Sequence, residues 1–132
     1  MKLRLTVVAA GAALVLAAVP VLAHHSFAAQ YDAAKPVELK GTITKVEWTN
    51  PHARFYIDVK DAKGEVANWN FELASPNVLV RNGWKRTTLQ IGAPISVAGY
   101  LGRSGVRMAI ATGVTASDGR ALFASAGPGS AQ

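Results

Sequence analysis

The sequence predicts a small, mostly β protein: an OB-like antiparallel β-barrel with one short helix between strands three and four, preceded by an N-terminal signal helix. Three observations lead to this fold class. Apolar and polar residues alternate over several short segments, as in strands with one buried face. Helix start and stop residues fall between the third and fourth segments. The first segment is long and changes phase, as in a strand shared by both halves of a barrel. A plain antiparallel sandwich is the alternative.

Residues 1–23 have the features of a secretory signal peptide. Lys2 and Arg4 precede an uncharged apolar run, and the segment ends in small residues at Ala23. The run is shorter than the roughly 20 apolar residues of a membrane helix, so an uncleaved anchor is the less favoured alternative. We therefore expect an exported protein, periplasmic or secreted, with His24 as its first residue and no stable membrane anchor after cleavage.

Composition limits the rest of the chain to one small domain. We expect an N-terminal arm over residues 24–36, the barrel over residues 37–124 and a disordered tail over residues 125–132. There is no cysteine, so the core alone must stabilise the fold. Without Lys2 and Arg4, 12 basic and 8 acidic residues leave a net charge of +4 that is scattered along the chain, and an exported protein rarely meets nucleic acid. Nucleic acid is therefore not expected as a partner, and a periplasmic protein partner is left open.

The first strand is expected from Val37 to Trp48. Apolar residues alternate as far as Ile43, and the next apolar pair is Val46 and Trp48. This slip of one residue predicts a bulge or a bend. The Asn-Pro pair within residues 49–52 then breaks the strand.

The next two strands form a hairpin whose register depends on the loop. A three-residue loop, Ala62–Gly64, places Phe55 opposite Phe71 and keeps one face of the hairpin apolar. A two-residue loop would place apolar residues opposite polar ones. The first register is preferred, and it places Arg54 opposite Glu72.

The remaining elements follow from caps and turns. Ser75 can cap a short helix near 76–82, with Pro76 in its first turn and Gly83 just after its end. Alternation after that helix predicts a fourth strand. Glycine-rich turns then separate it from a fifth strand over residues 106–115 and a short sixth segment over residues 121–124.

Several motifs resemble a known family. The pieces AHHSFAAQYD, EWTNPH, ASPN, RNGW and DGR are similar to those of small exported bacterial proteins catalogued as a domain of unknown function. The resemblance covers essentially the whole mature chain. It implies export and a compact β domain, and it implies no activity.

All three histidines suggest one metal site. A mature N-terminal His24 could bind a metal through its amine and its ring, and His52 could complete a three-nitrogen set. Copper(II) favours such nitrogen-rich sites, ahead of zinc. Alternatively, the amine, the intervening amide and the His25 ring could chelate copper without His52. The simplest interpretation is that these histidines have no metal role and that His52 only caps a turn.

Polar side chains suggest a second kind of site. The outer face of strands two and three is the usual ligand surface of OB-like barrels. This face could bind a protein, a glycan or a small anion. The alternative is that it is an ordinary solvent-exposed sheet face with no ligand. No enzyme is expected: cysteine is absent, and Ser26 near the two histidines has no predicted orienting acid. The residues placed on or beside the ligand face are Arg54, Tyr56, Asn68, Asn70, Glu72 and Trp84, although a tryptophan is more often a core residue.

Overall fold

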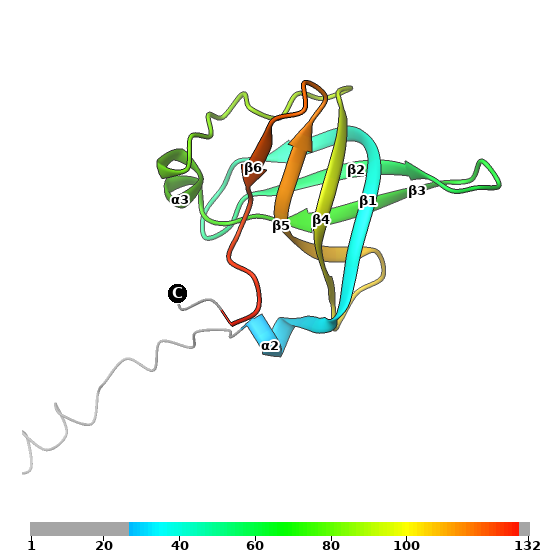
Figure 1. Ribbon diagram of the computed structural model, residues 1–132, viewed down its shortest axis with the longest axis horizontal. Helices are drawn as coiled ribbons and strands as arrows, with labels where there is room; N and C mark the ends of the chain where they lie inside the picture. The colour runs from blue at the N-terminus through cyan, green and yellow to red at the C-terminus, as the bar shows by residue number, and fades with distance from the viewer. Residues whose placement is uncertain (1–26, 130–132) are drawn as a thin grey trace, which may run out of the picture.

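The computed structural model describes residues 27–129, and the expected signal helix lies outside them. The chain forms a mostly β, OB-like fold with two short helices (Figure 1), which confirms the predicted fold class. No helix in this part of the chain is long and apolar enough to cross a membrane. The elements are α2 (Phe27–Gln30), β1 (Tyr31–Glu47), β2 (Arg54–Lys60), β3 (Val66–Glu72), α3 (Pro76–Arg81), β4 (Pro94–Gly102), β5 (Met108–Ala116) and β6 (Ala121–Phe123).

The sheet curls into a barrel. Its strand order is β3-β2-β1-β4-β5-β6, and a parallel pairing of β3 with β5 closes it. That pairing is short and places Asn70 opposite Met108 and Glu72 opposite Ile110. The β2–β3 hairpin continues beyond the barrel wall (Figure 1). The closing edge, defined here as the β3–β5 pairing and the residues around it, is where the candidate site lies.

Strand β1 is long because it serves two neighbours. Its first part pairs with β4 and its second part with β2, and the register shifts between Ile43 and Lys45, which confirms the predicted bulge. The strand begins at Tyr31, whereas the sequence placed the arm up to residue 36. Tyr31 pairs with Gly102, so tertiary pairing incorporates the end of the expected arm into the sheet.

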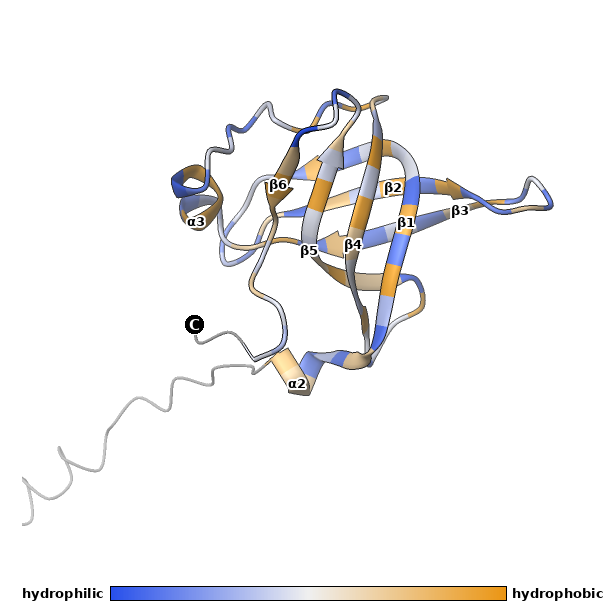
Figure 2. Ribbon diagram, in the orientation of Figure 1, coloured by the Kyte–Doolittle hydropathy of each residue, from blue (hydrophilic) through white to orange (hydrophobic). Residues whose placement is uncertain are grey.

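The predicted hairpin register is confirmed. Arg54 pairs with Glu72 and Phe55 with Phe71, and Gly64 has a positive φ of 85° in the loop. The alternation of apolar and polar residues along the strands is visible in Figure 2. The apolar side chains that point into the barrel form the core. Its largest fully buried side chains are Phe55, Phe71, Ile57, Leu73, Leu79 and Val97.

Helix α3 begins and ends as predicted. The Ser75 side chain accepts a hydrogen bond from the Val78 N–H, Pro76 follows the cap, and Gly83 has a φ of 87° just past the helix. Leu79 is fully buried, so the helix closes one side of the core.

Two expectations near the C-terminus do not hold. Trp84 was placed beside the ligand face, with a core position as the alternative, and it lies in the core: it is only 2% exposed and its Nε1 donates to the Phe123 carbonyl at 2.6 Å. Ser125, assigned to the disordered tail, is 6% exposed, and its Oγ donates to the Ala111 carbonyl at 2.5 Å. Both contacts join segments far apart in the sequence, so no local pattern indicates them.

Candidate site at the closing edge of the barrel

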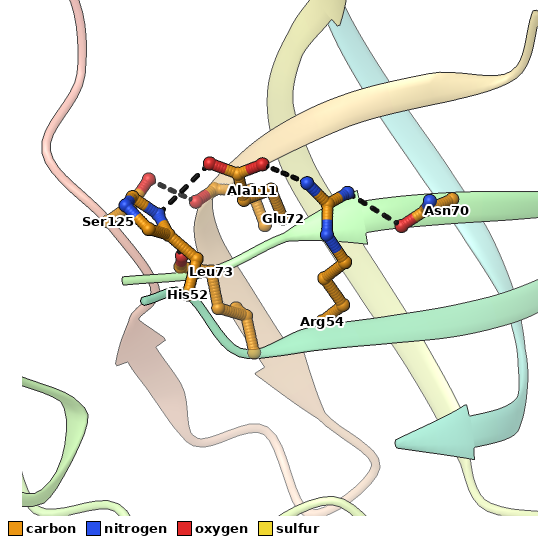
Figure 3. A network of polar contacts seen from close by, with 7 residues as sticks. All are labelled: His52, Arg54, Asn70, Glu72, Leu73, Ala111 and Ser125. Atoms are coloured by element: carbon orange, nitrogen blue, oxygen red, sulfur yellow. Dashed lines mark hydrogen bonds and ion pairs between the residues drawn. The ribbon is translucent and has the colours of Figure 1, made fainter. Parts of the chain in front are cut away.

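Glu72 lies at the centre of a polar network at the end of β3 (Figure 3). It is 6% exposed, and its two carboxylate oxygens contact two different partners. Oε1 is 3.0 Å from His52 Nδ1, while Oε2 accepts a hydrogen bond from Arg54 Nη2. A buried carboxylate needs such partners, because burial of an unpaired charge is costly.

His52 is held in one orientation by two acceptors. Its Nδ1 is hydrogen bonded to the Leu73 carbonyl oxygen at 3.1 Å and also faces Glu72 Oε1. Neither oxygen can donate, so Nδ1 must carry the proton. In the neutral ring, Nε2 is then left with a free lone pair. The side chain is 47% exposed, and no hydrogen bond to Nε2 occurs among residues 27–129.

Backbone pairing explains why His52 reaches this position. The Leu73 N–H donates to the Ala53 carbonyl at 2.9 Å, and the Ala53 N–H donates to the Ala74 carbonyl at 3.2 Å. These bonds extend the β2–β3 pairing by one step and place His52 beside the end of β3. The residue that follows His52 is therefore hydrogen bonded into the barrel wall.

Arg54 joins this centre to the outer face of the sheet. Besides Glu72, its guanidinium donates to Asn70 Oδ1 at 3.3 Å, and its side chain is 30% exposed. The backbone of Asn70 is fixed independently, because its N–H donates to the Arg107 carbonyl at 3.0 Å. Arg54 thus links Glu72 to Asn70, another residue of the predicted ligand face.

Tyr31 is a member of the site that the sequence analysis missed. It is 3% exposed at the start of β1. Burial raises the pKa of its phenol well above the ordinary range, and the Glu72 carboxylate beside it raises the pKa further. Nothing in the local pattern points to Tyr31, because its role depends on where the chain before residue 37 packs.

This pKa shift predicts alkaline destabilisation that Tyr31→Phe reduces. The folded-state pKa lies above the unfolded value of 10.0, so the stabilisation is complete below pH 10.0 and is lost as pH rises. One group contributes a slope of at most about 1.4 kcal/mol per pH unit. Urea unfolding from about pH 8 to about pH 11 measures it, with Tyr100→Phe as the control. Parallel curves for wild type and Tyr31→Phe would contradict the prediction.

The rest of the predicted ligand face is paired with itself. Tyr56 Oη donates to Glu47 Oε2 at 3.2 Å, and Lys45 Nζ donates to Glu47 Oε1 at 2.5 Å. The Lys45 hydrogen bond lowers the pKa of Glu47, and Glu47 in turn raises the pKa of Lys45. Asn68 donates to Asp58 Oδ1 at 2.8 Å. Each of these side chains therefore has a polar partner within the sheet.

The structure describes only one of the three predicted metal ligands. His24 and His25 lie outside the described residues, so the structure places His52 alone of the three. Within residues 27–129 there is no group of three or more His, Cys, Asp or Glu side chains that could hold a metal ion. The three-histidine set remains a prediction.

A cavity of about 310 Å³ opens beside His52, between the start of α3, β5 and the chain after β6. Its walls are mostly apolar. The side chains around it include His52, Ala74, Val78, Ile110 and Phe123. The His52 ring, whose Nε2 has no hydrogen-bond partner among residues 27–129, thus lies at the edge of a mostly apolar cavity.

Comparison with known families identifies the chain. Residues 12–112 match the family of unknown function DUF6152. The chain belongs to DUF6152. This confirms the resemblance to a family of unknown function inferred from the motifs. No curated protein matches this DUF6152 member.

Two solved structures are similar to this DUF6152 chain in fold. One is the mitochondrial single-stranded DNA binding protein Rim1 from S. cerevisiae, with 10% identity, a TM-score of 0.48, and coverage of 70% of this chain and 96% of that one. The other is the N-terminal domain of PriB from Thermoanaerobacter tencongensis, with 19% identity, a TM-score of 0.44, and coverage of 63% and 96%.

These structures correct one prediction about the DUF6152 chain. The exclusion of nucleic acid as a partner is withdrawn: it rested on the expectation of export, and one of the two similar structures is a single-stranded DNA binding protein. At 10% and 19% identity the likeness is one of fold, and it assigns no ligand to this chain.

Proposed function

We propose that this DUF6152 member is an exported copper(II)-binding protein, delivered to the periplasm or the medium. Its ligands would be the amine and ring of His24 at the mature N-terminus and Nε2 of His52, with His25 as the ligand of the simpler terminal chelate. The observation that supports this proposal is the orientation of His52. Its Nδ1 is occupied by Leu73 and Glu72, and Nε2 remains available.

This arrangement is the one that metal-binding histidines usually have. A ligating imidazole commonly donates its second N–H to a carboxylate or a backbone carbonyl, which fixes the tautomer and makes the ligating nitrogen more basic. His52 has both kinds of acceptor. Copper(II) is favoured over zinc, because an amine and imidazoles form the nitrogen-rich, near-planar set that copper prefers.

The described chain begins close to the polar network that contains His52, which supports the proposal. The Phe27 ring is 5.7 Å from the Tyr31 ring, Tyr31 lies beside Glu72, and Glu72 contacts His52. The chain from His24 to Phe27 spans at most about 10 Å when extended. This series of contacts supports a metal site that would draw ligands from both the mature N-terminus and His52.

A copper titration of the protein recovered from the periplasm tests the proposal. Intact mass must first show a start at His24. Binding, followed by the visible d–d band, should strengthen from about pH 5 to about pH 8 with release of protons, because an α-amine titrates near 8 and an imidazole near 6.5. His52→Ala should weaken binding by about tenfold or more. Gln90→Ala, an exposed polar position, is the control.

Other results separate the alternatives. An added Gly before His24, combined with His25→Ala, should weaken binding sharply, because the amine is moved away from the His24 ring. Binding that is unaffected by His52→Ala supports the terminal chelate and removes His52 from the site. Equally weak binding by all variants, or a mature start at Ser26 or later, contradicts a copper role. The face of β2 and β3 would then be the better candidate, as a metal-free site for a protein, a glycan or a small anion.

A further inference from the structure

The cavity beside His52 has the volume of a small-molecule site. It lies between His52, Val78, Ile110 and Phe123 and measures about 310 Å³. Ligand pockets in proteins start at roughly 300 Å³, and an apolar cavity of roughly 150 Å³ already binds benzene. This space, which we call the His52 cavity, therefore fits a molecule of one or two rings.

Hydrogen bonds within the barrel fix the walls of the His52 cavity. The Ala74 N–H donates to the Ala124 carbonyl at 2.8 Å, and the Ala124 N–H donates to the Thr112 carbonyl on β5 at 3.1 Å. The Ser75 side chain caps α3 by accepting a hydrogen bond from the Val78 N–H. The chain that enters α3, the chain after β6 and β5 are thus joined to one another, so the cavity is formed before any ligand arrives.

Apolar side chains make up most of the lining. Phe123 is 39% exposed, and its backbone is held in place because its carbonyl accepts a hydrogen bond from the Trp84 indole. Val78 is half-buried and Ile110 is buried beside it in the lining. An accessible aromatic ring gains from packing against a second ring. The lining therefore favours an aromatic occupant over a charged or a sugar-like one.

His52 supplies the free polar atom of the His52 cavity. Ser125, which lies at the same end of the network as His52 in Figure 3, donates through its Oγ to the Ala111 carbonyl, and Ser75 Oγ is engaged as the cap of α3. In the part of the chain that the structure describes, His52 Nε2 has no such partner. Because Nδ1 carries the proton, Nε2 of the neutral ring can accept a hydrogen bond but cannot donate one. It therefore recognises a hydroxyl group and offers nothing to an ether or a ketone.

We propose that the His52 cavity binds a small phenol, a molecule of one or two aromatic rings with a hydroxyl group. The ring packs against Phe123, Val78 and Ile110, and the hydroxyl donates to His52 Nε2. This inference does not rest on the copper site, because it concerns the metal-free protein. Copper(II) on the same nitrogen would compete with the hydroxyl, so the two ligands exclude each other at His52.

The test compares 4-methylphenol with toluene, which has the same ring and methyl group but no hydroxyl. Calorimetric titration of the mature protein is done with EDTA at about pH 8, where an ordinary imidazole is neutral. 4-Methylphenol should bind roughly threefold to tenfold more tightly than toluene, the gain expected from one hydrogen bond. 4-Methylanisole, whose oxygen cannot donate, should bind like toluene. In NMR spectra the amide signals of Ala74 and Ile110 should shift as 4-methylphenol is added.

Two variants separate the hydroxyl contact from the cavity itself. His52→Phe keeps a ring at the edge of the cavity and removes Nε2, so 4-methylphenol should lose its advantage over toluene. Val78→Phe fills the cavity and should weaken both probes by about tenfold or more. Val80→Phe, at a 57% exposed position of the same helix, is the matched control and should bind both probes as wild type does.

The opposite results overturn the proposal. Equal binding of 4-methylphenol and toluene by wild type removes the contact with His52, and unchanged binding by Val78→Phe places the probes elsewhere on the protein. If neither probe binds, the His52 cavity is no phenol site and belongs to another occupant, such as a segment of this chain or a partner protein. The copper proposal is judged by its own titration, so either proposal can fail without the other.

Discussion

Arg54→Met is expected to lower the free energy of unfolding by about 3 kcal/mol, at the low end of the cost of breaking a buried ion pair. The methionine keeps the apolar stem of the arginine but leaves Glu72, which is 6% exposed, without its guanidinium partner. His52 remains as a contact and is itself half exposed, so it replaces only part of the lost stabilisation. Urea unfolding followed by tryptophan fluorescence measures the change.

Two further variants test the cause of that loss. Arg54→Met combined with Glu72→Leu should recover much of the stability, because no unpaired carboxylate remains buried. Arg120→Met removes an exposed pair with Asp118 and should cost less than about 1 kcal/mol. A loss no larger for Arg54→Met than for Arg120→Met would show that the guanidinium is not what keeps Glu72 stable in the fold.

Phe71→Ala should be the more damaging substitution, with a loss of about 3–5 kcal/mol. Phe71 is fully buried, stacks on Phe55 at 5.4 Å between ring centroids, and also faces Trp69 at 6.3 Å. Removing the ring deletes apolar burial and leaves a cavity between strands that the barrel closure prevents from collapsing. Thermal and urea unfolding both measure the loss.

Val66→Ala is the control for Phe71→Ala, because it lies on the same strand and is 60% exposed. Its effect should stay within about 0.5 kcal/mol, as expected for a surface position. A loss below about 1.5 kcal/mol for Phe71→Ala would mean that the site relaxes around the deleted ring and that the core is packed less rigidly than the structure indicates.

Local features of the sequence determined most of the fold. The slip after Ile43 predicted the bulge in β1, and the loop ending at Gly64 determined the register that pairs Arg54 with Glu72. The start and the end of α3 were likewise predicted from Ser75 and Gly83. Such features are readable because side-chain alternation, turn glycines and capping residues act within a few positions along the chain.

The polar part of the site was predictable only as a set of residues on one face. The predicted ligand face held Arg54, Asn70 and Glu72 together, and the structure brings these three into one network with His52. The sequence did not show that Glu72 is buried, because its burial depends on the pairing of β3 with β5. The three-histidine metal set stays a prediction, since two of its members precede Phe27.

Tertiary structure alone decided what surrounds that network. Tyr31 joins Glu72 because the start of β1 pairs with the end of β4, Trp84 is buried because its indole reaches the Phe123 carbonyl, and Ser125 is held by Ala111. Each contact joins segments far apart in the sequence, and its free energy depends on the closed barrel rather than on the residues beside it. Periodicity and capping do not indicate such contacts. The sequence by itself therefore determined the strands, the helix and their register, whereas barrel closure decided which polar groups are buried beside His52.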